Sequence, residues 1–228
     1  MKLYYGPTSP FVRKVRIFAM EAGLDSRIEL QRTPVGMLRP NALVLGDNPL
    51  GKVPTLILED GPPLFESDLI CDYLDTLHNG PRLIPTEGPA RWQALRWNAA
   101  ASGALSTLVL WHNERLRSNV QRSTFLIDVF ALKTRTTLEW MTRELDSLTR
   151  KPFGIGHISV GCFLGYLSFR MPGDFPWRDD FPALALWESD FEERASARLT
   201  RPAPDSMSSV PPTSTTDSLS NLSGEPTQ

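Results

Sequence analysis

Residues 3–19, with the sequence LYYGPTSPFVRKVRIFA, carry the pattern from which the first half of the fold follows. Residues 3–5 are β-prone and run directly into a Gly-Pro turn, so a short strand is predicted there. Ser9 is a favoured residue for capping a helix, and Pro10 is tolerated at the first helical position. Apolar residues at helical spacing follow, which predicts a helix that ends near Gly23.

Strand and helix signals continue to alternate as far as residue 78. A second strand is predicted over residues 28–30, followed by a Pro- and Gly-containing loop over residues 33–51. Two short apolar runs, 55–58 and 64–65, predict a hairpin, and Ser67 is expected to cap the next helix. The order β-α-β-loop-β-β-α over residues 1–78 indicates an α/β domain with a mixed sheet.

The second half of the chain has a different pattern. Residues 79–89 are punctuated by Pro and Gly and are predicted to form a linker. Residues 90–201 are dominated by helix-forming sequence, which predicts an all-α domain whose apolar stretch 158–169 is a buried helix. Residues 202–228 are rich in Ser, Thr and Pro, and we expect this tail to be disordered because it cannot bury enough apolar surface.

Composition excludes several classes of protein. The 228 residues include 24 Lys and Arg against 26 Asp and Glu, a net charge of −2, which argues against a nucleic-acid-binding surface. No apolar run approaches the roughly 18 residues needed to cross a bilayer, and no signal peptide is recognisable. Cys71 and Cys162 lie far apart, and together with three His they give no metal-binding spacing. We expect a cytoplasmic protein that binds no metal, membrane or nucleic acid.

Lys52-Val53-Pro54 stands directly before the predicted strand at residue 55. A cis X-Pro bond at the start of a strand would turn the preceding backbone outward. Val53 could then offer its N–H and C=O to an extended peptide-like ligand, and Lys52 could supply a cation for a carboxylate. The alternative is a plain loop that ends in a strand.

Two predicted helix N-termini could bind anions. At Glu66-Ser67, backbone N–H groups and the hydroxyl suit an anion, and the Glu66 carboxylate suits an ammonium group. The alternative there is an ordinary helix cap. At the first helix, the Ser9 hydroxyl could cap the helix or donate to a ligand thiolate. Ser9 is a poor candidate nucleophile, because no His lies in a recognisable partner pattern.

These motifs, taken in order, resemble the cytosolic glutathione transferase family, and the likeness covers about residues 1–200. The matching stretches are residues 4–15 (YYGPTSPFVRKV), 48–54 (NPLGKVP), 64–67 (LFES), 70–74 (ICDYL), 155–158 (IGHI) and 164–167 (LGYL). The resemblance implies a thioredoxin-like N-terminal domain, an all-α helical-bundle C-terminal domain and a homodimer. It also implies glutathione as co-substrate, with no other cofactor.

The resemblance assigns a role to each part of the glutathione site. Val53 would bind the cysteinyl backbone, with Pro54 in the cis form. Glu66 and Ser67 would hold the γ-glutamyl end, and Lys52 would approach the glycine carboxylate.

The resemblance also points to the thiol end of the ligand. Ser9-Pro10-Phe11 looks like the serine form of an activating motif in which related branches carry Cys-Pro-Phe. Ser9 is therefore the candidate catalytic residue, and Thr8 is the alternative hydroxyl close to the same helix start. Trp111 and Arg115 could line the electrophile site, although Trp111 could equally be a core residue.

One stretch departs from the family pattern. Gly154-Ile155-Gly156-His157 stands where relatives often carry a Ser/Thr-x-x-Asp capping box, which puts the robustness of folding in doubt. We therefore expect His157 to act as a substitute cap or a core residue rather than as a base. Cys71 and Cys162 lie in apolar helical surroundings and are expected in the core. The basic side chains of Arg13, Lys14 and Arg16 are expected on a solvated helix face.

The function that follows is conjugation of glutathione to a hydrophobic electrophile, as in detoxification. A second hypothesis is a glutathione-transferase-like binding or regulatory module without turnover. A third, thiol–disulfide chemistry, is disfavoured because Ser9 occupies the position where redox relatives carry cysteine.

Overall fold

Three short strands form the sheet of the N-terminal half. In the computed structural model, which describes residues 1–37, 39–171, 173 and 175–203, the strands are β1 (Lys2–Tyr5), β2 (Glu29–Arg32) and β3 (Thr55–Ile57). The strand order is β2-β1-β3, with β1 parallel to β2 and antiparallel to β3. Leu3 of β1 lies opposite Leu30 and Leu56, so the predicted mixed sheet is confirmed.

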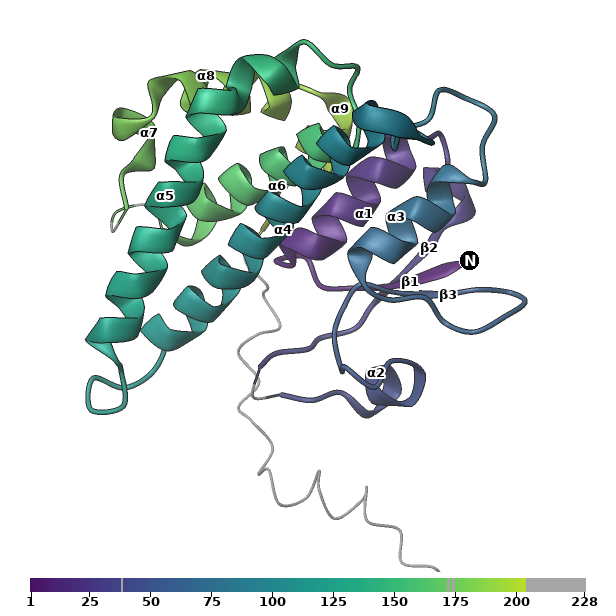
Figure 1. Ribbon diagram of the computed structural model, residues 1–228. Helices are drawn as coiled ribbons and strands as arrows, with labels where there is room; N and C mark the ends of the chain where they lie inside the picture. Colours follow the sequence, from purple (N-terminus) through teal and green to yellow (C-terminus); the bar gives the residue numbers. More distant parts are fainter. Residues whose placement is uncertain (38, 172, 174, 204–228) are drawn as a thin grey trace, which may run out of the picture.

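Helices cover both faces of this sheet (Figure 1). Helices α1 (Pro10–Glu21) and α3 (Ser67–Asp75) pack together on one face, and the short α2 (Ala42–Asp47) lies on the other. Successive residues of a strand point to opposite faces. Leu3 accordingly belongs to the large core, whereas Tyr4 belongs to a smaller cluster with Val44 of α2. A short 3-10 helix over Asp25–Arg27 precedes β2.

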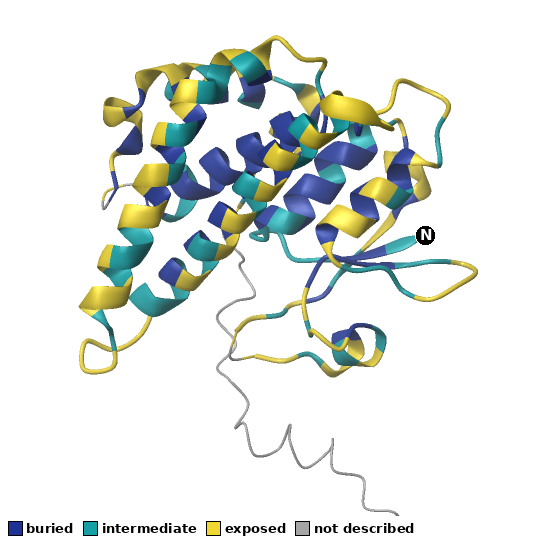
Figure 2. Cartoon of the chain, viewed as in Figure 1, coloured by how far each residue is buried: buried dark blue, intermediate teal, exposed yellow. Residues whose placement is uncertain are grey.

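The second half is helical throughout its described residues. Its elements are α4 (Gly88–Arg115), α5 (Thr124–Thr149), α6 (Ile155–Arg170), α7 (Trp177–Asp180), α8 (Pro182–Glu192) and α9 (Ala195–Leu199). Residues 155–167 of α6 are all buried, which confirms the predicted buried helix, and Figure 2 shows α6 as the inner helix of this half. No described helix has a long enough apolar window to span a membrane.

The two halves share one hydrophobic core. Phe18 of α1 and Trp97 of α4 belong to the same cluster of buried residues, and α1 packs directly on α6. The N-terminal half is therefore fixed against the helical half by α1.

Four local expectations need correction. The loop predicted over residues 33–51 contains α2, whose first turn is capped by the Asn41 side chain. The predicted hairpin is reduced to one bridge between Leu56 and Leu64. Ser67 does not cap α3, because Glu66 occupies the cap position and makes no side-chain cap bond. Helix α4 begins at Gly88, inside the predicted linker. The tail from residue 204 onward, which we expected to be disordered, lies outside the described residues.

Candidate functional site

Ser9 lies at the N-terminus of α1, where its Oγ accepts a hydrogen bond from the Val12 N–H at 3.3 Å. A hydroxyl has one donor and two acceptor positions, so this cap bond leaves the O–H of Ser9 able to donate. The Arg13 N–H is satisfied by the Ser9 carbonyl, while other first-turn N–H groups of a helix lack such partners. Ser9 is half-buried and combines a helix N-terminus with a hydroxyl donor.

Val53 and Pro54 stand at the start of β3 and are joined by a cis peptide bond, as predicted. Asn48 holds this turn, because its Nδ2 donates to the Lys52 carbonyl at 3.1 Å and to Thr55 Oγ1 at 2.9 Å. Within the described part of the chain, the N–H and C=O of Val53 have no backbone or side-chain hydrogen bond. Both groups can therefore bind an extended ligand.

Glu66 and Ser67 form the start of α3. Ser67 is buried, and Glu66 is exposed on an extended backbone with φ −85° and ψ −176°. The Lys52 Nζ lies 3.5 Å from Glu66 Oε1, with side chains 66% and 49% exposed. An exposed pair of this kind contributes little stability, so either group can exchange its partner for a ligand charge.

Sheet topology brings the three segments together. The end of β1 leads through Gly6 to Ser9, and β3 pairs with β1 so that Tyr4 lies opposite Thr55. A side-chain atom built on Gly6 would lie 4.0 Å from the Val53 side chain. Because α3 packs on α1, two helix N-termini and the free peptide groups of Val53 lie at one end of the sheet.

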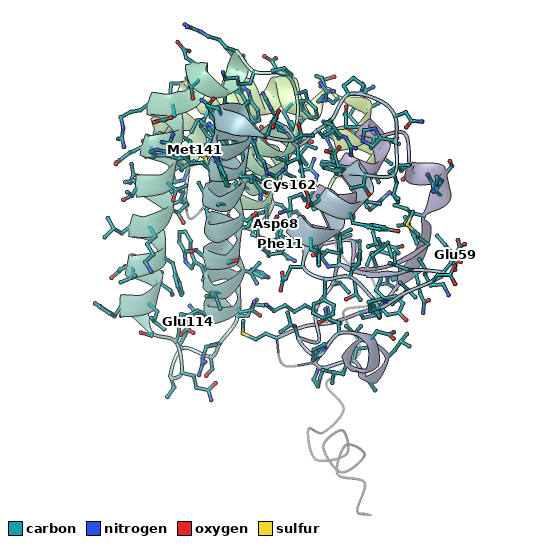
Figure 3. All side chains as sticks on the ribbon, turned by 45° about the vertical axis from the view of Figure 1, so that its right-hand side comes forward. Phe11, Glu59, Asp68, Glu114, Met141 and Cys162 are labelled. Atoms are coloured by element: carbon teal, nitrogen blue, oxygen red, sulfur yellow. The ribbon has the colours of Figure 1, made fainter. Side chains whose placement is uncertain are left out.

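Lys14 is the largest departure from expectation in this region. Its side chain is 0% exposed, so the predicted solvated face is wrong for Lys14. Its Nζ donates to Asp68 of α3, to Asn98 Oδ1 of α4 at 3.3 Å and to Ser102 Oγ of α4 at 3.0 Å. Asn98 Oδ1 also accepts from Ser159 of α6 at 2.6 Å. Figure 3 shows Phe11 and Asp68 close together where the N-terminal half meets α4. We call these five polar residues the Lys14 network.

Arg13 is also buried, which corrects the same prediction. Its guanidinium donates to Glu192 Oε1 at 2.6 Å and to the Ala197 carbonyl at 3.2 Å, and it lies against Gly165 of α6. Arg16 is half-buried. Arg13 and Lys14 therefore join α1 to the helical half, because polar groups of that half accept hydrogen bonds from both side chains.

The two residues expected at the electrophile site lie near the end of α4. Trp111 is 3% exposed and packs edge-on against Phe175 at 5.6 Å between ring centroids, which places it in the core. Arg115 donates from Nη1 to the Arg170 carbonyl at 3.1 Å and contacts the Met171 sulfur. Core packing, the alternative that the sequence left open for Trp111, is thus what the geometry favours.

His157 and the cysteines lie where the sequence places them. His157 Nδ1 accepts from the Gly154 N–H at 3.3 Å, so the ring caps α6 in place of an acidic residue. Burial lowers the pKa of His157 to about 4, although a hydrogen bond to Leu148 opposes the shift. Cys71 and Cys162 are buried free thiols, and burial raises the pKa of Cys162 to about 11. Neither thiol is suited to nucleophilic chemistry.

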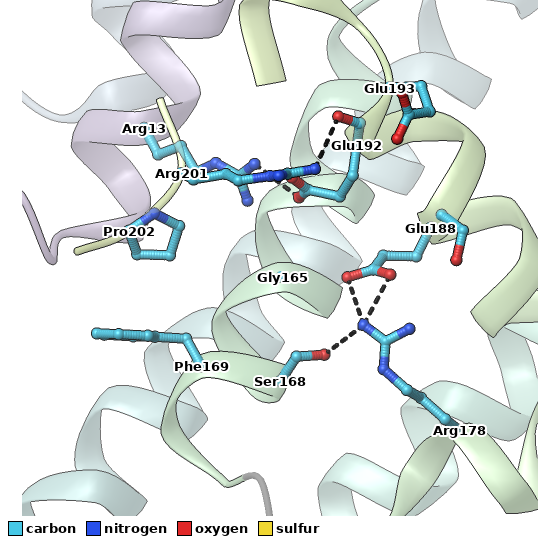
Figure 4. A pocket seen from close by; sticks show the side chains of 11 residues that line it. Arg13, Gly165, Ser168, Phe169, Arg178, Glu188, Glu192, Glu193, Arg201 and Pro202 are labelled. Carbon is cyan, nitrogen blue, oxygen red and sulfur yellow. Dashed lines mark hydrogen bonds and ion pairs between the residues drawn. The ribbon is translucent and has the colours of Figure 1, made fainter. Parts of the chain in front are cut away.

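A cavity of about 450 Å³ lies apart from these segments, between α1, α6, α7, α8 and the residues that follow α9 (Figure 4). Arg178 pairs with Glu188 on one wall, and Glu192 pairs with Arg201 on the other. Ser9, Val53 and Glu66 are absent from its lining. Among the described residues no cluster of His, Cys, Asp or Glu is suited to hold a metal ion.

A small mixed sheet covered by helices, followed by a helical half, defines a thioredoxin-like domain joined to a helical domain. Residues 8–77 match the model for the glutathione S-transferase N-terminal domain. The uncharacterized GST-like protein YibF of Escherichia coli (strain K12) is 31% identical over 209 residues, which are 89% of this chain and 99% of the relative. The chain therefore belongs to the glutathione transferase family.

Solved structures agree with this assignment. A glutathione transferase family member from Pseudomonas fluorescens Pf-5 with bound glutathione is 40% identical, with a TM-score of 0.86 over 89% of this chain and 99% of that chain. A structure of a family member from the same organism with bound S-(propanoic acid)-glutathione gives 38% identity and a TM-score of 0.82, covering 90% and 100% of the two chains. The predicted fold class is confirmed.

Sequence reasoning missed the Lys14 network. The amphipathic spacing of α1 places Lys14 beside Val15 and Phe18, but it does not reveal which side chains face it from other elements. Asp68, directly after Ser67, carried a usable signal, because an acidic residue in the first turn favours a helix N-terminus.

Proposed function

We propose that this protein is a glutathione transferase that joins the glutathione thiolate to a hydrophobic electrophile. The observation that carries the proposal is the convergence of Ser9, the free peptide groups of Val53 and the start of α3 at one end of the sheet. In this arrangement Ser9 offers a hydroxyl for the thiol, Val53 offers backbone groups for an extended ligand, and the start of α3 offers a site for the charged end of that ligand.

In the proposed complex, Val53 pairs with the cysteinyl backbone of glutathione, as an added strand would. Glu66 binds the γ-glutamyl ammonium group, and Ser67 with the first N–H groups of α3 binds its carboxylate. Lys52 leaves Glu66 and approaches the glycine carboxylate. The exposure of the Lys52–Glu66 pair makes this exchange inexpensive.

Ser9 activates the thiol by donating its O–H to the sulfur. A thiol of pKa about 8.5 needs a shift of roughly 1.5 units to be half ionised at neutral pH, which requires about 2 kcal/mol. A helix N-terminus supplies about 0.3–1 kcal/mol, and a hydrogen bond to a charged sulfur supplies about 1.5–3 kcal/mol. The helix N-terminus alone supplies less than the roughly 2 kcal/mol that this pKa shift requires, so the Ser9 hydroxyl is needed to ionise the thiol. Phe11, next in the motif, shields this end of the site, and Thr8 is the neighbouring hydroxyl.

The chemical step is the attack of the bound thiolate on an electrophile that is held next to it. The thiolate sulfur attacks an electrophilic carbon, a sulfur–carbon bond forms, and a leaving group departs with its electron pair. In an addition, the neighbouring carbon takes up a proton instead. Proximity of two bound reactants supplies much of the acceleration.

The test is the ultraviolet absorbance of bound thiolate as a function of pH. In Ser9→Ala we expect the pKa of bound glutathione to rise by at least one unit and conjugation to fall at least tenfold, matching a lost bond of about 1.5 kcal/mol or more. Thr8→Val is the matched control and should keep the wild-type pKa. An unchanged pKa in Ser9→Ala would refute the mechanism.

The alternative is a glutathione-binding module without turnover. In that case Ser9 would serve only as the cap of α1, where its Oγ accepts from the Val12 N–H. Capture on immobilised glutathione followed by a screen of electrophiles separates the two, because a binding module is captured but gives no product.

We also infer a cytoplasmic homodimer with a role in detoxification. The buried free thiols of Cys71 and Cys162 suit a reducing compartment. Large apolar side chains are exposed on α3 and α4 (Leu69 and Trp92), which the Asp72–Arg91 pair brings close, as expected where a second copy covers them. Light scattering at micromolar concentration tests the dimer, and a monomer would refute it.

A further inference from the structure

Arg170, the last residue of α6, has unused hydrogen-bonding capacity. Its guanidinium carbon lies 4.6 Å from the ring centroid of Phe169 and 5.6 Å from that of Tyr166. Its guanidinium is in hydrogen-bond contact with the Tyr166 hydroxyl, but its Nε is buried without a partner, and it forms no ion pair with any carboxylate of the described residues. A partly buried guanidinium normally pairs with an anion, because removing its charge from water is costly.

The end of α4 fixes the position of Arg170. The Arg115 guanidinium donates to the Arg170 carbonyl at 3.1 Å, so the last turns of α4 and α6 lie side by side. His112, one turn earlier on α4, is half-buried, and its pKa is lowered to about 4 by burial and then by the charges of Arg170 and Arg115. The Arg170 charge is therefore directed toward the side of α4 that carries His112.

That side of α4 is the one that faces Ser9 and its helix. Asn98 and Ser102 mark it, since both contact Lys14 of α1. His112 follows Asn98 by 14 residues, close to four full turns at about 3.6 residues per turn, so it lies on nearly the same face.

Helix α1 runs antiparallel to α6, which brings Ser9 to the level of Arg170. At the far end of α1, Glu21 binds Arg194, whose guanidinium lies 3.7 Å from the Phe153 ring just before α6. Near the middle, Arg13 lies on Gly165. Ser9 is four residues before Arg13, about 6 Å along the axis at 1.5 Å per residue, and thus beside residues 168–170 of α6.

We infer that Arg170 binds a carboxylate on the second substrate, so that this site takes apolar or aromatic electrophiles that carry a negative charge. The inference rests on the proposed function and deepens it by naming the substrate class. The planar guanidinium matches a carboxylate in two-point geometry, and the adjacent Phe169 ring favours an aromatic body next to that carboxylate.

The experiment compares two conjugates of glutathione that differ by one charge. S-(4-carboxybenzyl)glutathione and S-(4-carbamoylbenzyl)glutathione have nearly the same shape, and isothermal titration calorimetry gives the affinity of each. We expect the full-length protein to bind the carboxylate about tenfold more tightly, which is about 1.4 kcal/mol. The preference should shrink as salt is raised. In Arg170→Met it should fall to twofold or less, and in Arg170→Lys it should be intermediate.

Arg96→Met is the matched control, since it removes one arginine of α4 that pairs instead with Glu144 and lies over Trp140. It should keep the wild-type preference. Equal affinities for the two conjugates in the wild type overturn the inference whether or not the variants fold, as does a preference that persists in Arg170→Met. Failure of the proposed function looks different, because glutathione would then not bind, or would bind without being joined to any electrophile.

Discussion

The Lys14 network predicts that an exposed residue contributes more to stability than its buried partner. Lys14 is 0% exposed, whereas its counterion Asp68 has a side chain that is 53% exposed. Asp68→Asn leaves the Lys14 ammonium buried without a counterion, and breaking a buried pair in this way costs about 3–5 kcal/mol. An amide oxygen still accepts from Nζ, so we expect the lower end, about 3 kcal/mol. Loss of an acidic residue from the first turn of α3 adds about 0.3–1 kcal/mol.

Lys14→Met should destabilise the protein less than Asp68→Asn does, because it removes the buried charge itself. Methionine fills a similar volume and removes the buried charge, while the Asp68 carboxylate regains water and Asn98 Oδ1 keeps its bond from Ser159. The lost hydrogen bonds are therefore largely offset by the desolvation that is no longer required. We expect Lys14→Met to lower the free energy of unfolding by about 1–2 kcal/mol. The double variant that combines Lys14→Met with Asp68→Asn should lose less than Asp68→Asn alone.

Urea unfolding followed by circular dichroism measures both losses, and thermal melts check them. A loss of about 3 kcal/mol corresponds to a Tm lower by roughly 6–12 °C in a chain of this size. Asp72→Asn is the control on the same helix, because Asp72 is exposed and its Arg91 partner lies 3.9 Å away, and it should change stability by less than about 0.5 kcal/mol. A larger loss in Lys14→Met than in Asp68→Asn would refute the reasoning.

Two further predictions concern the start of α6 and acid stability. A Cβ on Gly154 would lie 2.3 Å from the Leu83 carbonyl oxygen, so Gly154→Ser should lower the Tm although it restores a capping residue; an unchanged or higher Tm would contradict this. Burial holds the pKa of His157 and His112 near 4 in the folded protein, below the unfolded value of about 6.5. The unfolded state therefore binds more protons, and unfolding free energy should fall as pH drops from about 6.5 toward 4. His157→Gln should flatten that slope in urea titrations at several pH values.

Elements whose signals are local could be predicted from the sequence. Ser9 and Pro10 begin α1 because a capping hydroxyl and a proline at the first helical position act within one turn. Gly23, which follows the C-cap residue Ala22 of α1, has φ 70°, the left-handed conformation that glycine adopts without strain. The missed helix α2 carried the same kind of signal at Asn41, but the surrounding Pro and Gly residues favoured a loop.

Burial of charge could not be predicted, because it depends on partners distant in sequence. Lys14 meets Asp68 54 residues later, and Arg13 meets Glu192 179 residues later. A run of basic residues on a helix looks the same in sequence whether water or carboxylates face it. The same limit explains why Gly154 suggested a weakened cap, when the close approach of the Leu83 carbonyl leaves no room for a side chain.

The position of the Lys14 network connects fold stability to the proposed chemistry. Lys14 is on the helix that begins beside Ser9, and Asp68 directly follows Ser67 on α3, whose start is the proposed γ-glutamyl site. Lys14 bonds directly to Asp68 and also donates to Asn98 and Ser102, so one ammonium group joins α1 to α3 and anchors both to α4. An apolar contact at this position could slide, because dispersion is non-directional, whereas hydrogen bonds to one ammonium group fix direction as well as distance. A charged contact between the halves therefore suits a site whose ligand must span from one helix start to the other.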